Sequence, residues 1–139
     1  MASIQNFTDL KVWQKARVLS KLIYEMTLLD KFSKDYGLKN QINDSSGSIM
    51  DNIAEGFGRK GNLELINFLT YAYGSTLECM SQVNRAFDRL YISEINQTEL
   101  LSLLVEISKM LTSLIIYLRG SDIRGEKFKT RRSPPKTNN

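Results

Sequence analysis

Apolar residues recur at steps of three and four along four stretches of this chain, which is the spacing of one face of an α-helix. The predicted helices are residues 8–29, 37–57, 62–90 and 97–119. No stretch has the strict alternation of a half-buried strand. Because the connections between the helices are short, neighbouring helices are expected to run in opposite directions. The pattern therefore predicts an all-α protein, an antiparallel up-down-up-down four-helix bundle with short loops.

The ends of these helices are indicated by residues that favour caps. The candidate N-caps of the first, third and last helices are Thr8, Asn62, and either Asn96 or Thr98. Gly56 or Gly58 can take the left-handed conformation that closes the second helix, and Gly120 is expected to end the last one. Small residues at 45–48 predict that another helix approaches the second helix closely.

Residues 52–62 form a corner between the two central helices, with three glycines and two cations. Arg59 is expected to pair with Glu55, four residues earlier, or with Glu78 on the next helix. The glycines do not make a phosphate-binding loop of the Walker type, because the spacing differs and the segment follows a helix instead of a strand. Arg59 and Lys60 remain a candidate anion contact.

A second apolar stripe on the third helix is more than one small bundle requires. It consists of Ile66, Tyr73, Leu77, Met80 and Phe87. If this stripe is exposed it favours self-association, so we expect a homo-oligomer with these residues at the interface. Trp13, beside the stripe of the first helix, is expected either in the core or at the same interface.

Composition excludes several classes of chemistry. The chain has 139 residues, no histidine and one cysteine. It therefore lacks the commonest general base and zinc ligand, and Cys79 on an apolar stripe predicts a small core residue. We expect no enzyme activity, no cofactor and no metal. Charged residues interrupt the most apolar segment and no signal peptide is evident, which predicts a cytoplasmic protein without a membrane span.

The excess positive charge lies at the C-terminus. Of 19 Lys and Arg and 15 Asp and Glu, residues 121–139 hold six and two, which leaves thirteen of each in residues 1–120. The cations are Arg124, Lys127, Lys129, Arg131, Arg132 and Lys136. The prediction is a bundle domain, 1–120, with a basic tail, 121–139, that is disordered when free. Such a tail binds a polyanion or serves only solubility, and Lys11, Lys15 and Lys21 form a second candidate ridge on the first helix.

Five short motifs carry a family resemblance. They are Phe7-x-x-Leu10-Lys11-Val12-Trp13-Gln14-Lys15-Ala16, Tyr36-Gly37-Leu38-x-x-Gln41-Ile42, Ser48-Ile49, Asn52-Ile53-Ala54-Glu55-Gly56-x-Gly58-Arg59 and Phe68-Leu69-x-x-Ala72-x-Gly74-Ser75-x-x-Glu78. Over roughly residues 7–118 the chain resembles the 23S ribosomal RNA intervening-sequence protein family, also called the four-helix bundle protein family. Related to that family are the accessory variability determinants of diversity-generating retroelements.

The resemblance implies a small bacterial bundle that assembles as a ring-like homo-pentamer and is encoded within insertions in 23S ribosomal RNA genes. For the related retroelement proteins it implies a basic surface that binds nucleic acid and a reverse transcriptase. This chain departs from the pattern after Ile42, where Asn43 and Asp44 replace the usual arginines. That change weakens any nucleic-acid surface on the second helix.

The function predicted from the sequence is that of a non-enzymatic, homo-oligomeric bundle protein. Its expected ligand is RNA or DNA, bound weakly and with strong salt dependence through clustered Lys and Arg. The cations are those of the tail together with Arg59 and Lys60. The alternative is a protein-interaction scaffold for a polymerase, a reverse transcriptase or a ribosomal component.

Overall fold

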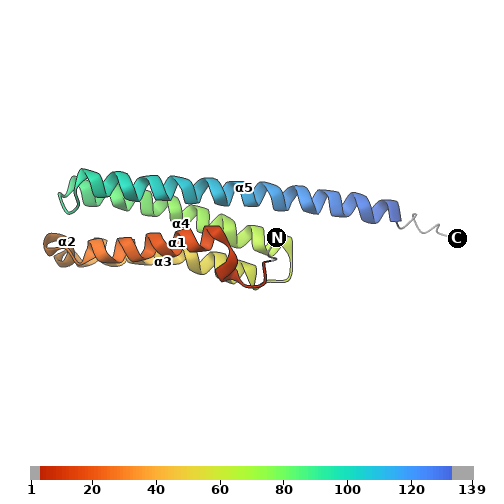
Figure 1. The fold of residues 1–139 in the computed structure, drawn as a ribbon, viewed down its shortest axis with the longest axis horizontal. Helices are drawn as coiled ribbons and strands as arrows, with labels where there is room; N and C mark the ends of the chain where they lie inside the picture. Colours follow the sequence, from red (N-terminus) through yellow and green to blue (C-terminus); the bar gives the residue numbers. More distant parts are fainter. Residues whose placement is uncertain (1–3, 133–139) are drawn as a thin grey trace.

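The computed structural model describes residues 4–132, and side chains for residues 4–121. Within residues 4–132 the chain is helical and has no strand, which confirms the predicted all-α class. The elements are a 3-10 helix η1 (Phe7–Asp9) and the α-helices α1 (Lys11–Thr27), α2 (Asp30–Lys34), α3 (Tyr36–Phe57), α4 (Asn62–Asp88) and α5 (Glu94–Arg132). The four long helices lie side by side along the longest axis of the molecule (Figure 1).

The core is built from the first apolar stripe of each long helix. Leu19 of α1, Ile49 of α3, Leu69 of α4 and Leu104 of α5 have no exposed surface. Burying a side chain of this size stabilises the fold by about 1.5–3 kcal/mol. Cys79 is also fully buried, as expected for a small core residue. The periodicity of the sequence therefore identifies the face that each helix buries.

The helices α3 and α4 approach closely near the corner that joins them. A Cβ atom on Gly56 would lie 2.7 Å from Cβ of Phe68, so only glycine fits there. Further along, the hydroxyl of Ser45 donates to Oε1 of Gln82 at 2.5 Å, and Ser48 and Ser75 share a hydrogen bond of 2.9 Å. The predicted close approach is found at these positions.

The first helix begins later than the sequence predicts. Thr8 does not cap it but lies within η1, where Oδ1 of Asn6 accepts from the Thr8 amide at 3.2 Å. The Asp9 side chain in turn accepts from the Asn6 amide at 3.1 Å. This reciprocal pair closes a separate short turn, and α1 starts at Lys11 after an extended Leu10.

The predicted caps of α4 and α5 are each displaced by one or more residues. Asn62 is the first residue of α4, and Gly61 before it has extended backbone without a side-chain cap. The last helix begins at Glu94, because Oγ of Ser93 accepts from the Asn96 amide at 3.1 Å. Neither Asn96 nor Thr98 is the cap. Glu64 does lie in the first turn of α4, where its negative charge interacts favourably with the positive end of the helix dipole.

The left-handed residue also differs from the prediction. Gly58 has φ of −74°, and none of the described glycines has a positive φ. Leu90 has φ of 62° instead, directly after Arg89, the C-cap residue of α4. Its amide donates to the carbonyl of Phe87 and the Tyr91 amide to that of Ala86, both at 2.9 Å. The end of α4 is therefore closed by a leucine in a conformation that ordinarily favours glycine.

The last helix does not end at Gly120 but continues to Arg132. A glycine inside a helix costs only about 1 kcal/mol relative to alanine, and residues 121–132 contain no proline. The backbone of residues 121–132 is thus helical, where the sequence predicts a tail that is disordered when free, and residues 133–139 lie outside the described part. Among the described residues, Glu94–Ser121 is the one helical stretch long and apolar enough, by length and composition alone, to cross a membrane, a test that core helices of soluble proteins also pass.

Candidate nucleic-acid interface

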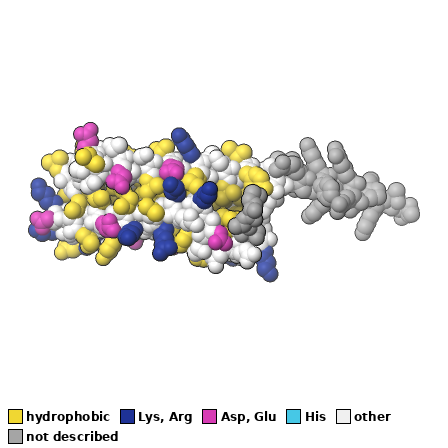
Figure 2. Space-filling view, viewed as in Figure 1, with side chains coloured by type: hydrophobic (Ala, Val, Ile, Leu, Met, Phe, Trp, Pro, Cys, Tyr) yellow, Lys and Arg dark blue, Asp and Glu magenta, His cyan; other side chains and the backbone are white. Residues whose placement is uncertain are grey.

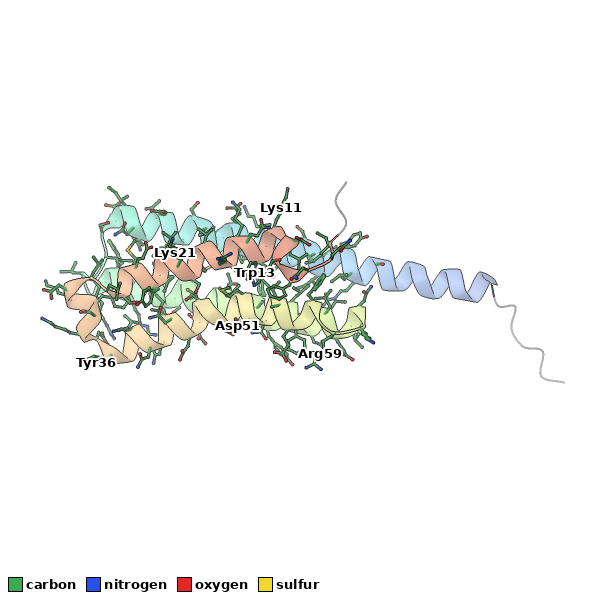
Figure 3. All side chains as sticks on the ribbon, turned by 60° about the horizontal axis from the view of Figure 1, so that its bottom comes forward. Lys11, Trp13, Lys21, Tyr36, Asp51 and Arg59 are labelled. Carbon is green, nitrogen blue, oxygen red and sulfur yellow. The ribbon has the colours of Figure 1, made fainter. Side chains whose placement is uncertain are left out.

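The corner cations Arg59 and Lys60 are both exposed. They follow α3, and Arg59 lies just beyond its last turn (Figure 3). Nη2 of Arg59 lies 3.2 Å from Oε1 of Glu55, which confirms the first of the two expected pairings. The Arg59 guanidinium also lies 5.3 Å from the centre of the Phe68 ring. With Glu55 and Glu64 nearby in sequence, the corner carries as many carboxylates as cations, so it adds little positive potential.

The opposite end of the molecule has its charges paired more tightly. Asp35 caps α3 by accepting from the Leu38 amide at 3.1 Å. Its other oxygen accepts from Nη1 of Arg89 at 2.7 Å and from the Tyr91 hydroxyl at 2.8 Å. These donors, first of all the Leu38 amide, hold the pKa of Asp35 below its ordinary value, and the hydrogen bond to Asp35 raises the pKa of Tyr91.

The short helix α2 completes this end, in the short connection between the predicted helices 8–29 and 37–57. Phe32 is 1% exposed and stacks on Tyr91, with ring centres 5.2 Å apart. One buried aromatic residue therefore anchors the five-residue helix.

The tail cations lie outside the described side chains. They are Arg124, Lys127, Lys129, Arg131, Arg132 and Lys136, of which Lys136 is also outside the described backbone. The backbone of the first five belongs to the last turns of α5, which extend beyond the ends of the other helices (Figure 1). On the described face of the body, basic and acidic side chains are interspersed (Figure 2).

The predicted ridge of Lys11, Lys15 and Lys21 is divided between two sides of α1. Lys11 lines a shallow groove with Lys109 of α5, and Nζ of Lys15 lies 3.2 Å from Oε1 of Glu106. Lys21 lies on the other side, toward α3. The three lysines therefore do not form one surface.

A second shallow groove, between α1 and α3, was not anticipated. We call it the α1–α3 groove, and it is lined by Arg17, Ser20, Lys21, Tyr24, Asn43 and Met50. Arg17 lies with its guanidinium 5.7 Å from the centre of the Trp13 ring. The positions 17, 21 and 24 share one helix face, and these two cations followed by a tyrosine are the signal in the sequence that could have revealed the groove.

The residues predicted at an oligomer interface are mostly part of the core of one chain. Trp13 is 8% and Ile66 6% exposed. Tyr73, Met80 and Phe87 are partly buried against the core. Of the predicted set Leu77 alone is a large exposed residue, at 47%. Among the side chains of α5 that the structure describes, the most exposed apolar ones are elsewhere, at Ile95, Ile116 and Tyr117.

No group of three potential metal ligands occurs in the part of the chain that the structure describes. Burial raises the pKa of the Cys79 thiol to about 12, so it stays protonated near neutral pH and is a poor nucleophile. Cys79 is therefore a core residue and offers no reactive thiol at the surface.

Comparison with known proteins supplies the remaining information. The model of the 23S rRNA-intervening sequence protein family matches residues 8–113. Among solved structures, a protein of unknown function from the S23 ribosomal protein family of Bacteroides thetaiotaomicron is 24% identical, with a TM-score of 0.69. The alignment covers 75% of this chain and 97% of that one, and at this identity it shows the fold alone. No curated protein matches the chain.

Proposed function

The chain belongs to the 23S rRNA-intervening sequence protein family, and we propose that it is a non-enzymatic, homo-oligomeric protein that binds RNA or DNA through clustered Lys and Arg. The observation that carries the proposal is the position of the excess charge. Residues 121–139 hold six cations and two carboxylates, and α5 carries five of these cations beyond the other helices (Figure 1). A cationic helix that stands clear of the body is accessible to phosphates.

The physical mechanism is the release of counterions. Each phosphate that a Lys or Arg neutralises frees a condensed counterion, so the logarithm of the binding constant falls linearly with the logarithm of the salt concentration. Six contacts to duplex DNA would give a slope of about −5. Such contacts position the backbone and read little sequence. The body, with thirteen charges of each sign, contributes little to this term.

We propose further that the four long helices form the predicted antiparallel bundle and that several copies assemble, as a pentamer by family resemblance, in the cytoplasm. The bundle is supported by the contacts of α3 with α4, of α4 with α5, and of α1 with both α3 and α5. Assembly is supported by apolar residues on the surface of α5, where Val105 is 41%, Ile116 63% and Tyr117 62% exposed. Several basic helices on one assembly would add weak contacts by multivalency.

The test is fluorescence anisotropy of labelled structured RNA and duplex DNA over a salt series. The full chain should bind with a steep linear dependence on salt. A chain ending at Gly120 should lose the binding, while its circular dichroism falls only by the share of the helical residues removed with the end of α5. Arg131→Gln with Arg132→Gln should weaken binding. The control, Lys31→Gln with Lys34→Gln, removes the same charge at the opposite end and should not. Unchanged affinity without residues 121–139 would exclude this segment as the site.

A second candidate function is a scaffold for a protein partner such as a polymerase, a reverse transcriptase or a ribosomal component. It is favoured by exposed apolar side chains at one end of the molecule, on the α1–α2 and α4–α5 connections and beside them. They are Leu28, Leu29, Tyr36, Leu90 and Ile95. A co-purifying protein that survives nuclease treatment and is lost with Leu90→Ser would support this alternative.

A further inference from the structure

Two cations of the α1–α3 groove are available to a ligand. Arg17 and Lys21 are exposed, and neither forms an ion pair with any of the side chains described, whereas Lys15, Arg59 and Arg89 do. The aromatic face of Trp13 positions the Arg17 guanidinium at 5.7 Å. A guanidinium that lies on an aromatic face loses little further freedom when it binds a phosphate.

The rest of the groove is suited to a flat, partly polar group. Tyr24 is 55% exposed on the same face of α1, and Met50 of α3 is half-buried beside the groove. The side-chain nitrogen Nδ2 of Asn43 donates to the Lys39 carbonyl at 3.0 Å and to Oγ1 of Thr27 at 3.3 Å. These bonds fix the orientation of the side chain, and its Oδ1 has no donor among the described residues.

We propose that the α1–α3 groove binds single-stranded nucleic acid, with one unpaired base stacked on Tyr24 and the neighbouring phosphates at Arg17 and Lys21. An exposed aromatic residue beside cations can hold a single strand, because every base offers a π-face that stacks on the ring while the cations contact the backbone. A duplex keeps its bases stacked inside the helix and cannot present one to Tyr24. The inference rests on the function proposed above and gives it a second contact surface with a defined class of ligand.

The charges around the groove set the path of the strand. On the outer face of α3, Asp44, Asp51 and Glu55 line a separate polar hollow with Gly47 and Ser48. Carboxylates repel phosphate, so the backbone is confined to the α1 side, where Arg17 and Lys21 lie. Asn43 stands at the boundary between the two hollows and lines both.

The experiment compares an unstructured oligouridine RNA with a blunt RNA duplex of the same length, each titrated with the full chain. Tyr24→Ala should weaken oligouridine binding about tenfold, as expected for the loss of one stacked base, and leave duplex binding unchanged. Tyr24→Phe keeps the ring and should bind as the wild type does. The matched control is Tyr71→Ala, which removes a tyrosine that is 61% exposed on α4 and should change neither affinity.

Two further measurements make the result specific to the groove. Trp13 is the only tryptophan and contacts Arg17, so its emission should change when oligouridine binds the wild type and should not change in Tyr24→Ala. Arg17→Gln with Lys21→Gln should reduce the salt slope for oligouridine by about 1.4, the value for two lost contacts to a single strand. Both substitutions lie on the surface, and circular dichroism checks that each variant is folded.

The outcomes separate this inference from the function on which it rests. A wild-type chain that binds neither probe at low salt would overturn nucleic-acid binding altogether. A wild type that binds oligouridine no better than Tyr24→Ala does, with silent Trp13 emission, would overturn the groove and leave the basic end of α5 as the binding surface.

Discussion

At the corner between α3 and α4 the chain is closed by backbone proximity, with Gly56 against Phe68 only twelve residues later. At the other end of the molecule the closure depends on one carboxylate. Asp35 binds Arg89 and Tyr91, which lie 54 and 56 residues further along the chain. Figure 3 shows the two ends, marked by Arg59 and Tyr36.

The two ends of the molecule hold α3 and α4 together in different ways. The corner needs only the absence of a side chain at Gly56, and the ion pair between Arg59 and Glu55 is an additional contact on the surface. The Asp35 end joins the start of α3 to the connection between α4 and α5, so its contacts form only when the whole chain is folded. The first closure is local and steric, while the second is long-range and electrostatic.

The largest effect is expected from filling the corner. Gly56→Ala places a methyl group 2.7 Å from Cβ of Phe68 and 3.1 Å from Cδ1 of Leu65, and the Phe68 Cβ cannot move without its backbone. Overpacking of this kind should lower the free energy of unfolding by about 1–3 kcal/mol, measured by urea denaturation. Gly47→Ala is the control, since nothing lies within 4 Å of its Cβ, and it should raise stability by up to about 1 kcal/mol. Equal effects of the two substitutions would contradict the steric account.

The next largest effect is expected from Asp35→Asn, and it is measured as the melting temperature over a range of pH. Because its folded pKa is lowered from the ordinary 3.8, Asp35 stabilises the protein fully above that value and loses this contribution as the pH falls through the folded value. The melting temperature of the wild type should therefore drop below pH 3.8 by more than that of Asp35→Asn. At neutral pH the variant should already be less stable, because Arg89 has lost its partner. If the melting temperatures of the two proteins fall in parallel with pH, Asp35 is not the source of the loss of stability in acid.

The sequence predicts the local half of this comparison well. The helical stripes, the corner and the Glu55–Arg59 pair follow from spacings of three and four residues, which periodicity reports directly. The contacts of Asp35 were not predicted, since its partners are more than fifty residues away and nothing in the nearby residues indicates them. Helix starts were displaced for a related reason, because Asn6 and Ser93 compete with the predicted caps and only backbone geometry decides between them.

The candidate site was predicted in part. Net charge identified the C-terminal segment, because charge counts need no structure, but the end of α5 was misplaced at Gly120, since glycine alone does not stop a helix. The division of the α1 lysines between two grooves depends on which helices flank α1. That arrangement is set by packing of the whole chain, so Arg17 and Tyr24 were not grouped with Lys21.

A smaller effect is expected at Leu90, which belongs to the Asp35 end but closes α4 by backbone conformation, as the corner was predicted to do. Leucine with φ of 62° is strained, and the side chain is 76% exposed and so gains little from burial. Leu90→Gly should therefore stabilise the protein by about 1 kcal/mol, seen as a higher midpoint of urea unfolding. A loss of stability would mean that the Leu90 side chain makes contacts that outweigh the strain.

The smallest effect sharpens the comparison between the two ends directly, since each has one arginine of nearly equal exposure. The Arg59 side chain is 48% exposed and pairs with Glu55, which is 56% exposed, at 3.2 Å. The Arg89 side chain is 46% exposed, but its partner Asp35 is only 20% exposed and the distance is 2.7 Å. Arg59→Ala should cost about 0.5 kcal/mol, a value typical of exposed pairs, and the cost should shrink in high salt. Arg89→Ala should cost more and keep most of that cost in salt, because its partner is screened less. If thermal unfolding at low and high salt gives the two substitutions the same cost, the Asp35 end is no more than a second surface ion pair.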